Sequence, residues 1–201
     1  LVPDVLLRPI LRRITRRKIR QLERLPFPEL ERQRRALLAS LQKSPIAVHT
    51  DLPNLQHYEV PPEFFQLVLG ERLKYSCCFW PPGVEDLEEA EERMLDLTCR
   101  RAGLEDGMTV LDLGCGWGSL NLWIAEHYPA CRVLAVSNSR DQVDFIRDQA
   151  RRRGYPGVEA RVMDVSEFSL QGGFDRVFSI EMFEHMKNYP RLLGEISRVL
   201  N

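Results

Sequence analysis

Hydrophobic and polar residues follow two different periods over the second half of the chain. Short apolar runs predict buried strands, and apolar residues three and four positions apart predict helices. The predicted strands are 109–113, 132–137, 158–163 and 174–180. The predicted helices are 119–128, 140–153 and 190–199. Because strands separated by helices are joined by right-handed crossovers, the pattern predicts an α/β fold with a Rossmann-like, doubly wound parallel sheet.

The first part of the chain is predicted to be a basic helical extension. Residues 5–22 carry Leu7 and Leu11 at helical spacing, and a second helix is predicted near 28–43. Residues 1–43 contain twelve Lys and Arg against four Asp and Glu, giving +8, whereas the remaining chain has sixteen against twenty-five, giving −9. We expect this extension to pack on the α/β domain with its basic face in water. Peripheral contact with an anionic membrane is the alternative, and no nucleic-acid partner is predicted.

The middle of the chain is predicted to be rich in loops. Two Pro-Pro pairs break it, a short helix is predicted at 62–69, and Asp86 is the predicted N-cap of a helix that ends at Gly103. Polar groups among large apolar rings suit the wall of a small-molecule pocket, and buried packing beneath a loop is the alternative. The residues in question are His57, Tyr58, Tyr75, Ser76 and Cys77.

The cysteines and the absence of long apolar runs limit the cellular setting. The five cysteines are odd in number and lack metal-ligand spacing with the four histidines, so we expect free thiols and no metal. Free thiols are typical of a reducing compartment. No apolar run reaches the length of a membrane span, and no signal peptide is evident. The chain is therefore expected to be cytoplasmic.

The strongest motif is VLDLGCGWGSL, in which a glycine-rich turn directly follows an apolar strand. Gly114, Gly116 and Gly118 let the backbone turn tightly and approach a ligand, and the helix that begins near Ser119 points free N–H groups at it. The spacing is G-x-G-x-G with Asp112 two residues before it, whereas dinucleotide sites prefer G-x-G-x-x-G. This pattern indicates S-adenosylmethionine-dependent methyltransferases. A tight turn without a ligand is the alternative.

Polar residues also follow the second predicted strand. Many nucleotide-binding domains place a carboxylate there for the ribose hydroxyls, but this chain has Ser137 and Asn138, with Gln142 one helical turn further. These side chains can still form hydrogen bonds with a diol, although less strongly than a carboxylate. Ser139 is instead a candidate cap for the next helix.

Titratable residues follow the third and fourth strands. Asp164 can accept a hydrogen bond from an adenine amino group while Val165 packs on the ring, although an aspartate here is also a common turn or cap residue. Glu181, Glu184 and His185 come directly after the fourth strand. Three such groups at a strand's carboxyl end predict an acid–base site, with a structural histidine as the alternative.

Taken together, these residues make the chain similar to a known family. It resembles the coclaurine N-methyltransferase-like branch of the cyclopropane-fatty-acid synthase family, from about His57 to the C-terminus and more weakly through the N-terminal helices. The segments HYEVPPEFFQLVLGERLKYSCC and SIEMFEHMKNY are long and specific, whereas the glycine turn alone identifies only the superfamily. The resemblance implies a class I methyltransferase fold, S-adenosylmethionine as cofactor and a small amine as substrate.

The resemblance also implies roles for matching positions. The cofactor positions are Tyr75 and Ser76 for covering it, Gly114 and Gly116 for its methionine part, Ser137 and Gln142 for the ribose, and Asp164 and Val165 for the adenine. In the family's N-methyltransferases, Glu184 and His185 match residues that assist amine methylation, with Glu181 nearby. In lipid-cyclopropanating members, the positions of Cys77 and Glu184 help to hold a bicarbonate that acts as base.

Two departures favour the amine branch over methylene transfer to an unsaturated phospholipid. Cyclopropanating members usually have Gly where this chain has Glu181, and Ala where it has Cys78. A carboxylate at position 181 can pair with a cationic amine, whereas a lipid chain would gain nothing from it. The expected role of Glu184 and His185 is then to take or relay the proton of the amine.

The resemblance further implies that the chain is truncated after the fourth strand. The family continues through three more strands and a substrate-covering insertion, so we expect an exposed edge on which Val177, Phe178 and Ile180 lack cover. A non-catalytic cofactor-binding module is a third alternative for such a chain. The expected organisation is a basic helical extension over 1–56, a cofactor-covering segment and helix over 57–108, and an S-adenosylmethionine-binding core over 109–201.

Overall fold

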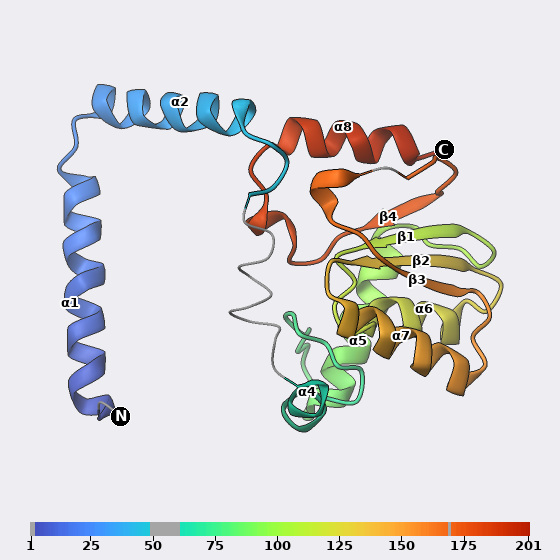
Figure 1. The fold of residues 1–201 in the computed structure, drawn as a ribbon. Helices are drawn as coiled ribbons and strands as arrows, with labels where there is room; N and C mark the ends of the chain where they lie inside the picture. Colours follow the sequence, from blue (N-terminus) through green and yellow to red (C-terminus); the bar gives the residue numbers. More distant parts are fainter. Residues whose placement is uncertain (1–2, 49–60, 169) are drawn as a thin grey trace. The chain divides into compact units, whose positions relative to one another are not determined.

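A parallel β-sheet is the framework of residues 44–201 in the computed structural model, which describes residues 3–48, 61–168 and 170–201 (Figure 1). Its strands are β1 (Thr109–Leu113), β2 (Arg132–Ser137), β3 (Val158–Val162) and β4 (Arg176–Phe178). Their order is β3-β2-β1-β4, so the chain winds outward from β1 and then returns to its other side. The predicted doubly wound α/β sheet is confirmed. Ligands of such sheets bind beyond the strands' carboxyl ends, where the winding reverses.

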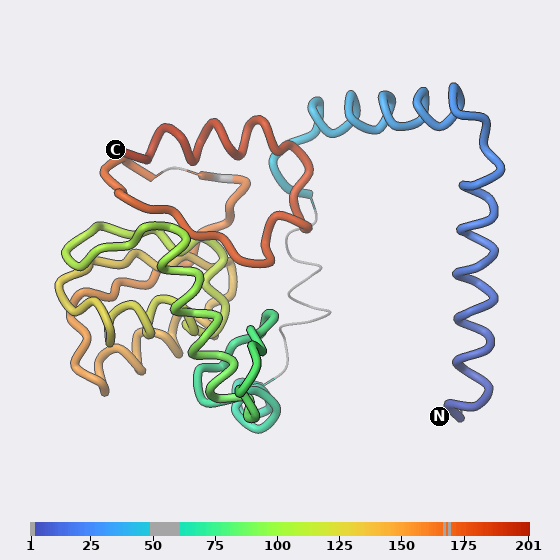
Figure 2. Tube along the Cα trace, turned by 180° about the vertical axis from the view of Figure 1, so that it is seen from behind, coloured from blue at the N-terminus to red at the C-terminus, as the bar shows by residue number. Residues whose placement is uncertain are grey.

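Helices cover both faces of this sheet (Figures 1 and 2). The helices of one face are α5 (Leu87–Arg101), α6 (Ser119–His127) and α7 (Arg140–Arg153), and the opposite face carries α8 (Tyr189–Val199). The short helix α4 (Pro62–Val68) precedes α5. Two single 3₁₀ turns, η2 (Val165–Glu167) and η3 (Phe183–His185), follow β3 and β4.

Alternation along β1 divides the core into layers. Val110 packs with Leu95 of α5 and Ile124 of α6, whereas Leu111 packs with Leu192 of α8. All five side chains are fully buried. Successive residues of a strand point to opposite faces, so a strand covered on both faces is expected to be apolar throughout, as the sequence of β1 is apart from Thr109 at its start and Asp112.

The fourth strand is shorter and better covered than the sequence predicted. The pattern predicted a strand over 174–180, but β4 pairs with β1 only from Arg176 to Phe178. The expectation that its side chains lack cover was wrong: Phe178 is buried with the α5 and α6 cluster, Ile180 packs against that cluster, and Val177 packs on the α8 side. A strand at a sheet edge lacks hydrogen-bond partners along one side, but its two faces can still be covered.

Helix caps predicted from the sequence are present. Asp86 accepts the backbone N–H three residues on (2.8 Å) at the start of α5, and Ser139 does the same for α7 (3.4 Å). Gly103, the predicted end of the helix that begins after Asp86, is left-handed with φ of 59°, and its N–H donates to the Arg100 carbonyl (3.0 Å). These caps depend only on neighbours in sequence, which is why the pattern located them.

The residues that follow α2 belong to the larger of two units. The chain divides into residues 1–43 and residues 44–201. Ile46 (2% exposed) and Ala47 (5%) are buried in the core cluster on the α8 side, and the Lys187 N–H donates to the Ile46 carbonyl (2.8 Å). The predicted boundary after residue 56 lies outside the described residues.

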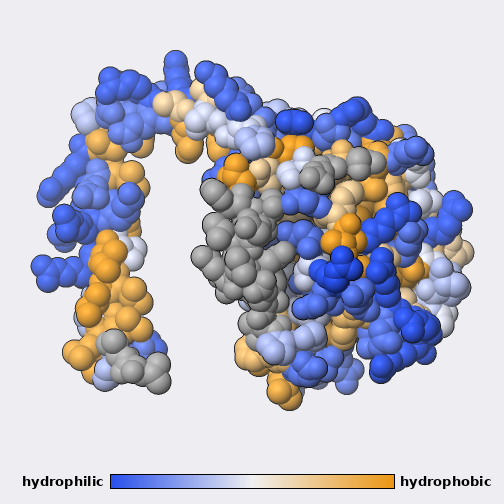
Figure 3. All heavy atoms as spheres, in the orientation of Figure 1, coloured by the Kyte–Doolittle hydropathy of each residue, from blue (hydrophilic) through white to orange (hydrophobic). Residues whose placement is uncertain are grey.

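The smaller unit consists of α1 (Asp4–Glu23) and α2 (Phe27–Lys43), close to the predicted helices. Neither helix has a buried residue, so apolar and basic side chains are both at the surface of α1 (Figure 3). Ion pairs one turn apart, such as Arg8 with Asp4 (2.6 Å), lie along the helices. None of the helices within the described ranges combines the length and the apolar character needed to span a bilayer.

Candidate functional site

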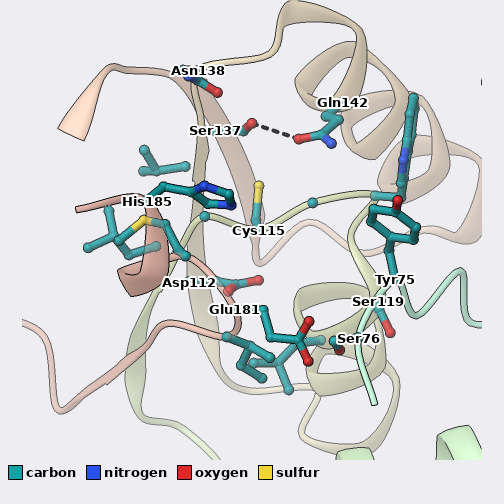
Figure 4. A pocket seen from close by; sticks show the side chains of 18 of the residues that line it. Tyr75, Ser76, Asp112, Cys115, Ser119, Ser137, Asn138, Gln142, Glu181 and His185 are labelled. Atoms are coloured by element: carbon teal, nitrogen blue, oxygen red, sulfur yellow. Dashed lines mark hydrogen bonds between the residues drawn. The ribbon is translucent and has the colours of Figure 1, made fainter. Parts of the chain in front are cut away.

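A cavity of about 380 Å³ lies at the carboxyl ends of the four strands (Figure 4). The predicted site residues that line it are Tyr75, Ser76, Asp112, Gly114, Gly116, Ser137, Asn138, Gln142, Asp164, Val165, Glu181, Glu184 and His185. These residues come from segments far apart in sequence, and the parallel sheet brings them to one edge. The volume suits a small molecule.

The glycine turn after β1 forms part of one wall of the cavity. Gly114 and Gly116 are left-handed, with φ of 83° and 52°, and the N–H groups of Gly114 and Cys115 donate to the Val136 carbonyl (2.9 and 3.0 Å). A Cβ at Gly116 would meet no atom within 4 Å, so the space over this residue is open. Gly118 differs. It does not line the cavity, and a Cβ there would lie 2.8 Å from Ile146, so it serves helix packing.

Asp112 places a buried carboxylate in this cavity. It is 3% exposed, and its Oδ2 accepts a hydrogen bond from Asn121 Nδ2 (2.9 Å). Burial raises the pKa of Asp112 to about 6, although the Asn121 hydrogen bond acts in the opposite direction. A positively charged group in the cavity would stabilise the ionised form, so the site favours a cationic ligand.

Two lining residues that the sequence did not indicate carry buried polar atoms. Trp117 Nε1 and Ser119 Oγ have no hydrogen-bond partner within the described parts of the chain. The Trp117 ring packs between Phe65 (4.9 Å between ring centroids) and Phe145 (5.5 Å). Buried polar groups normally have partners, so these two atoms are expected to bond a ligand. The motif contained both residues, but the burial of their polar atoms is a tertiary property.

The end of β2 is joined to α7 by side-chain hydrogen bonds. Ser137 Oγ donates to Gln142 Oε1 (2.7 Å), and the Ser139 N–H donates to Ser137 Oγ (3.1 Å), so the wall is held in one arrangement (Figure 4). Ser139 caps α7, as the alternative interpretation predicted. Asp164 caps η2 by accepting the Ser166 N–H (2.8 Å), as the alternative interpretation predicted, and it also lines the cavity.

The loop of residues 180–186, here called the acid–base loop, forms the opposite wall. His185 and Glu181 line the same cavity as Asp112 (Figure 4). Glu184 and His185 belong to η3 and are exposed to solvent. The Tyr189 hydroxyl donates to the Phe183 carbonyl (3.1 Å), which fixes this turn. The two predicted reactive groups are therefore held on the cavity wall and remain in contact with water.

Residues 73–78, here called the covering segment, contribute Tyr75 and Ser76 to the lining. Cys77 does not line the cavity and its side chain is exposed, but its N–H donates to Glu181 Oε1 (3.2 Å). Lys74, which the sequence did not indicate, is 5% exposed and lines the cavity. The predicted wall residues His57 and Tyr58 lie outside the described residues.

Comparison with known proteins agrees with this architecture. Residues 49–201 match the family model described as mycolic acid cyclopropane synthetase. The chain is 39% identical over 196 residues to an (S)-coclaurine N-methyltransferase from Thalictrum flavum subsp. glaucum, an alignment that covers 98% of this chain and 54% of that protein. This chain therefore spans about half the length of that relative. The predicted resemblance is confirmed.

Solved structures give the same result for the fold. A crystal structure of coclaurine N-methyltransferase bound to N-methylheliamine and S-adenosylhomocysteine has a TM-score of 0.91 at 39% identity, covering 100% of this chain and 58% of that one. A mycolic acid cyclopropane synthase complexed with S-adenosylhomocysteine has a TM-score of 0.70 at 27% identity, covering 79% of this chain and 55% of that one. The predicted Rossmann-like methyltransferase fold is therefore confirmed.

Proposed function

Since the chain belongs to the mycolic acid cyclopropane synthetase family, we propose that its cavity binds S-adenosylmethionine and serves N-methylation of a small amine. The observation that carries the proposal is that one cavity is lined both by the glycine turn with Asp112 and by Glu184 with His185. The first set suits a cationic nucleotide-like ligand, and the second set suits proton transfer. The coclaurine N-methyltransferase relatives favour an amine as acceptor.

The residues present fit this cofactor. Its ammonium and sulfonium groups are cations, which match the buried carboxylate of Asp112. Its carboxylate needs donors, and the buried hydroxyl of Ser119 at the start of α6 is a donor without a partner in the described structure. Ser137 and Gln142 would hold the ribose, with Asp164 and Val165 at the adenine.

When bound, S-adenosylmethionine supplies an electrophilic methyl group on a positively charged sulfur. An amine acts as a nucleophile only in its neutral form, so a base must hold the proton of the ammonium form. A ring nitrogen of His185 accepts this proton, and the neighbouring Glu184 carboxylate stabilises the resulting imidazolium. Because both side chains are exposed, the proton then passes to water. Glu181, on the same loop, adds a negative charge that attracts the protonated amine before it reacts.

Calorimetric titration with S-adenosylhomocysteine tests the first half of the proposal. We expect binding to residues 1–201 and clearly weaker binding to Gly116→Val, whose side chain would fill the open space over the glycine turn. Lys43→Met, which changes a charge in the smaller unit, is the control. Equal affinity of Gly116→Val and the unchanged chain would contradict the cofactor site.

Parallel assays with amines and with unsaturated phospholipid test the second half. Both products gain one carbon, so NMR must locate it on nitrogen or in a cyclopropane ring. A new N-methyl group supports the proposal, and a cyclopropane product would replace it with lipid methylene transfer. Binding of S-adenosylhomocysteine without either product would instead support a cofactor-binding module.

A further inference from the structure

A buried lysine beside the cavity has no part in the function proposed above. Lys74 is 5% exposed, and its ammonium group contacts the Ser76 hydroxyl. Burial lowers the pKa of Lys74, whereas charge interactions with the nearby thiols and carboxylates act in the opposite direction. The charged or titratable groups that face it are Cys77 and Cys78 of its own segment, Glu181 of the acid–base loop and Glu91 of α5. A buried ammonium is costly unless such partners surround it.

Glu91 of α5 anchors the start of the covering segment through hydrogen bonds to its backbone. This carboxylate is 1% exposed, and it accepts the N–H groups of Arg72 (2.9 Å) and Lys74 (3.2 Å). Between these two residues Leu73 has a φ of 50°, a conformation that side chains other than glycine rarely adopt. A strained residue persists only where its surroundings fix it. The two hydrogen bonds to Glu91 span Leu73 and fix it.

Glu181 holds the same segment from the opposite wall. Its Oε1 accepts the Cys77 N–H (3.2 Å), and its carboxylate lies next to Ser76 (Figure 4). Glu181 has a φ of 53°, and together with Leu73 it makes up the non-glycine residues with positive φ in the described parts of the chain. Both strained positions therefore lie where the covering segment is anchored.

We infer that Lys74 is a positioning residue, which holds Glu181 and Ser76 so that the covering segment stays latched to the acid–base loop. Its ammonium group contacts the Ser76 hydroxyl, and two carboxylates from different elements hold the residues on either side: Glu91 of α5 accepts the Lys74 N–H, and Glu181 of the loop after β4 accepts the Cys77 N–H. Removal of the Lys74 ammonium takes away the group that holds the Ser76 side chain and a positive charge that faces Glu181, so the hydrogen bond from the adjacent Cys77 N–H to Glu181 is weakened. The inference rests on the proposed function only in assigning the cavity to the cofactor.

Amide hydrogen exchange of the ¹⁵N-labelled chain tests the latch without any turnover. We expect Lys74→Met to accelerate exchange of the Cys77 amide by about tenfold, while amides of α6 and β1 keep their protection. Lys187→Met removes the same charge from an exposed position near the acid–base loop and should leave Cys77 exchange unchanged. In a Glu181→Ala background, Lys74→Met should add almost nothing, because the interaction through which it acts is already absent.

Two results would overturn the inference. One is equal Cys77 exchange in Lys74→Met and the unchanged chain, and the other is full additivity of Lys74→Met with Glu181→Ala. If the amides of the whole sheet also lose their protection from exchange in Lys74→Met, that variant is unfolded and the test uses Glu181→Ala instead. Glu181 is exposed, so its replacement should leave the fold intact. In that variant, NMR titration must show a lower pKa of Lys74, and an unchanged pKa would equally reject the latch.

Binding separates this inference from the proposed function. S-adenosylhomocysteine should bind Lys74→Met several-fold more weakly than the unchanged chain, because Tyr75 and Ser76 are no longer held over the cavity. If the unchanged chain fails to bind it, the proposed cofactor site is wrong, while the exchange experiment still decides the role of Lys74. If binding is equal in both proteins and exchange differs, the latch exists but does not serve the cofactor.

Discussion

The two walls of the cavity are built in different ways. The wall formed by β1, β2 and the glycine turn consists of backbone and buried side chains such as Asp112 (3% exposed) and Gln142 (4%). The opposite wall is the acid–base loop, where Glu184 and His185 are exposed on a single 3₁₀ turn. A buried wall fixes the position of a ligand, whereas an exposed wall can exchange protons with water. Under the proposed function, ligand recognition and proton transfer are therefore assigned to different walls of one cavity.

The largest effect is expected from the exposed wall. Glu184→Gln and His185→Asn should each lower the rate of amine methylation by about 10²–10⁴-fold in a turnover assay, because proton transfer is lost. The thermal unfolding temperature should not change, since exposed side chains contribute little to stability. Unchanged turnover with intact binding of S-adenosylhomocysteine would remove the pair from the mechanism.

The next effect concerns the stability of the buried wall. The pKa of Asp112 is raised from 3.8 to about 6 in the folded chain, so its protonated form is favoured on folding. This contribution is fully present below pH 3.8 and is lost as the pH rises through 6. In denaturant titrations without ligand, the ionisation of Asp112 should therefore lower the free energy of unfolding by about 3 kcal/mol as the pH rises over this range.

Asp112→Asn is the control for this pH dependence, because an amide does not titrate. Its free energy of unfolding should change less between pH 3 and pH 7 than that of the unchanged chain, by the amount assigned to Asp112. Parallel pH curves for the two proteins would show that the carboxylate is not held in a desolvated state.

A smaller effect separates two glycines of the same turn. Gly118→Ala should lower the free energy of unfolding by about 1–3 kcal/mol, because its φ is 88° and the new Cβ would lie 2.8 Å from Ile146. Gly116→Ala meets no neighbouring atom and should cost about 1 kcal/mol, from its conformation alone. Chemical denaturation of the pair measures the difference. A reversed order would mean that Gly118 is not pressed against α7.

The smallest effect is the pH dependence of binding to the buried wall. S-adenosylmethionine is a cation, and ionised Asp112 should attract it more strongly than protonated Asp112 does. Its affinity should therefore fall about tenfold from pH 7 to pH 5, measured by calorimetry. Asp112→Asn should show a low affinity that hardly depends on pH over this range. An equally steep dependence in that variant would point to another titrating group.

Much of the fold was predictable because local patterns decide it. The order of strands and helices follows from periodicity, and the caps at Asp86 and Ser139 follow from neighbours three residues away. The length of β4 was not predictable in this way. Apolar residues continue to Ile180, but pairing with β1 ends at Phe178, and only the partner strand sets that limit. The burial of Ile46 and Ala47 likewise depends on a core formed by residues far along the chain.

The candidate site was predictable to the extent that motifs carry it. The glycine turn and the Glu184–His185 pair were identified from spacing and resemblance, and the sheet brings them to one cavity. Lys74 gave no such signal, since a single lysine in a loop is ordinary until its burial is known. Cys77 was expected at the site through its side chain, but the structure brings only its backbone N–H into contact with Glu181.

The sequence by itself determined the α/β alternation, the helix caps and the motif after β1, because each depends on residues adjacent along the chain. The tertiary structure alone decided which residues of the motif line the cavity. Gly118 packs against Ile146 of α7 and does not line it, whereas Trp117 and Ser119 bury polar atoms in the lining. It also decided that Glu91 and Glu181 meet the covering segment from opposite sides. Contacts between distant segments form only when the sheet assembles, so no local pattern specifies them.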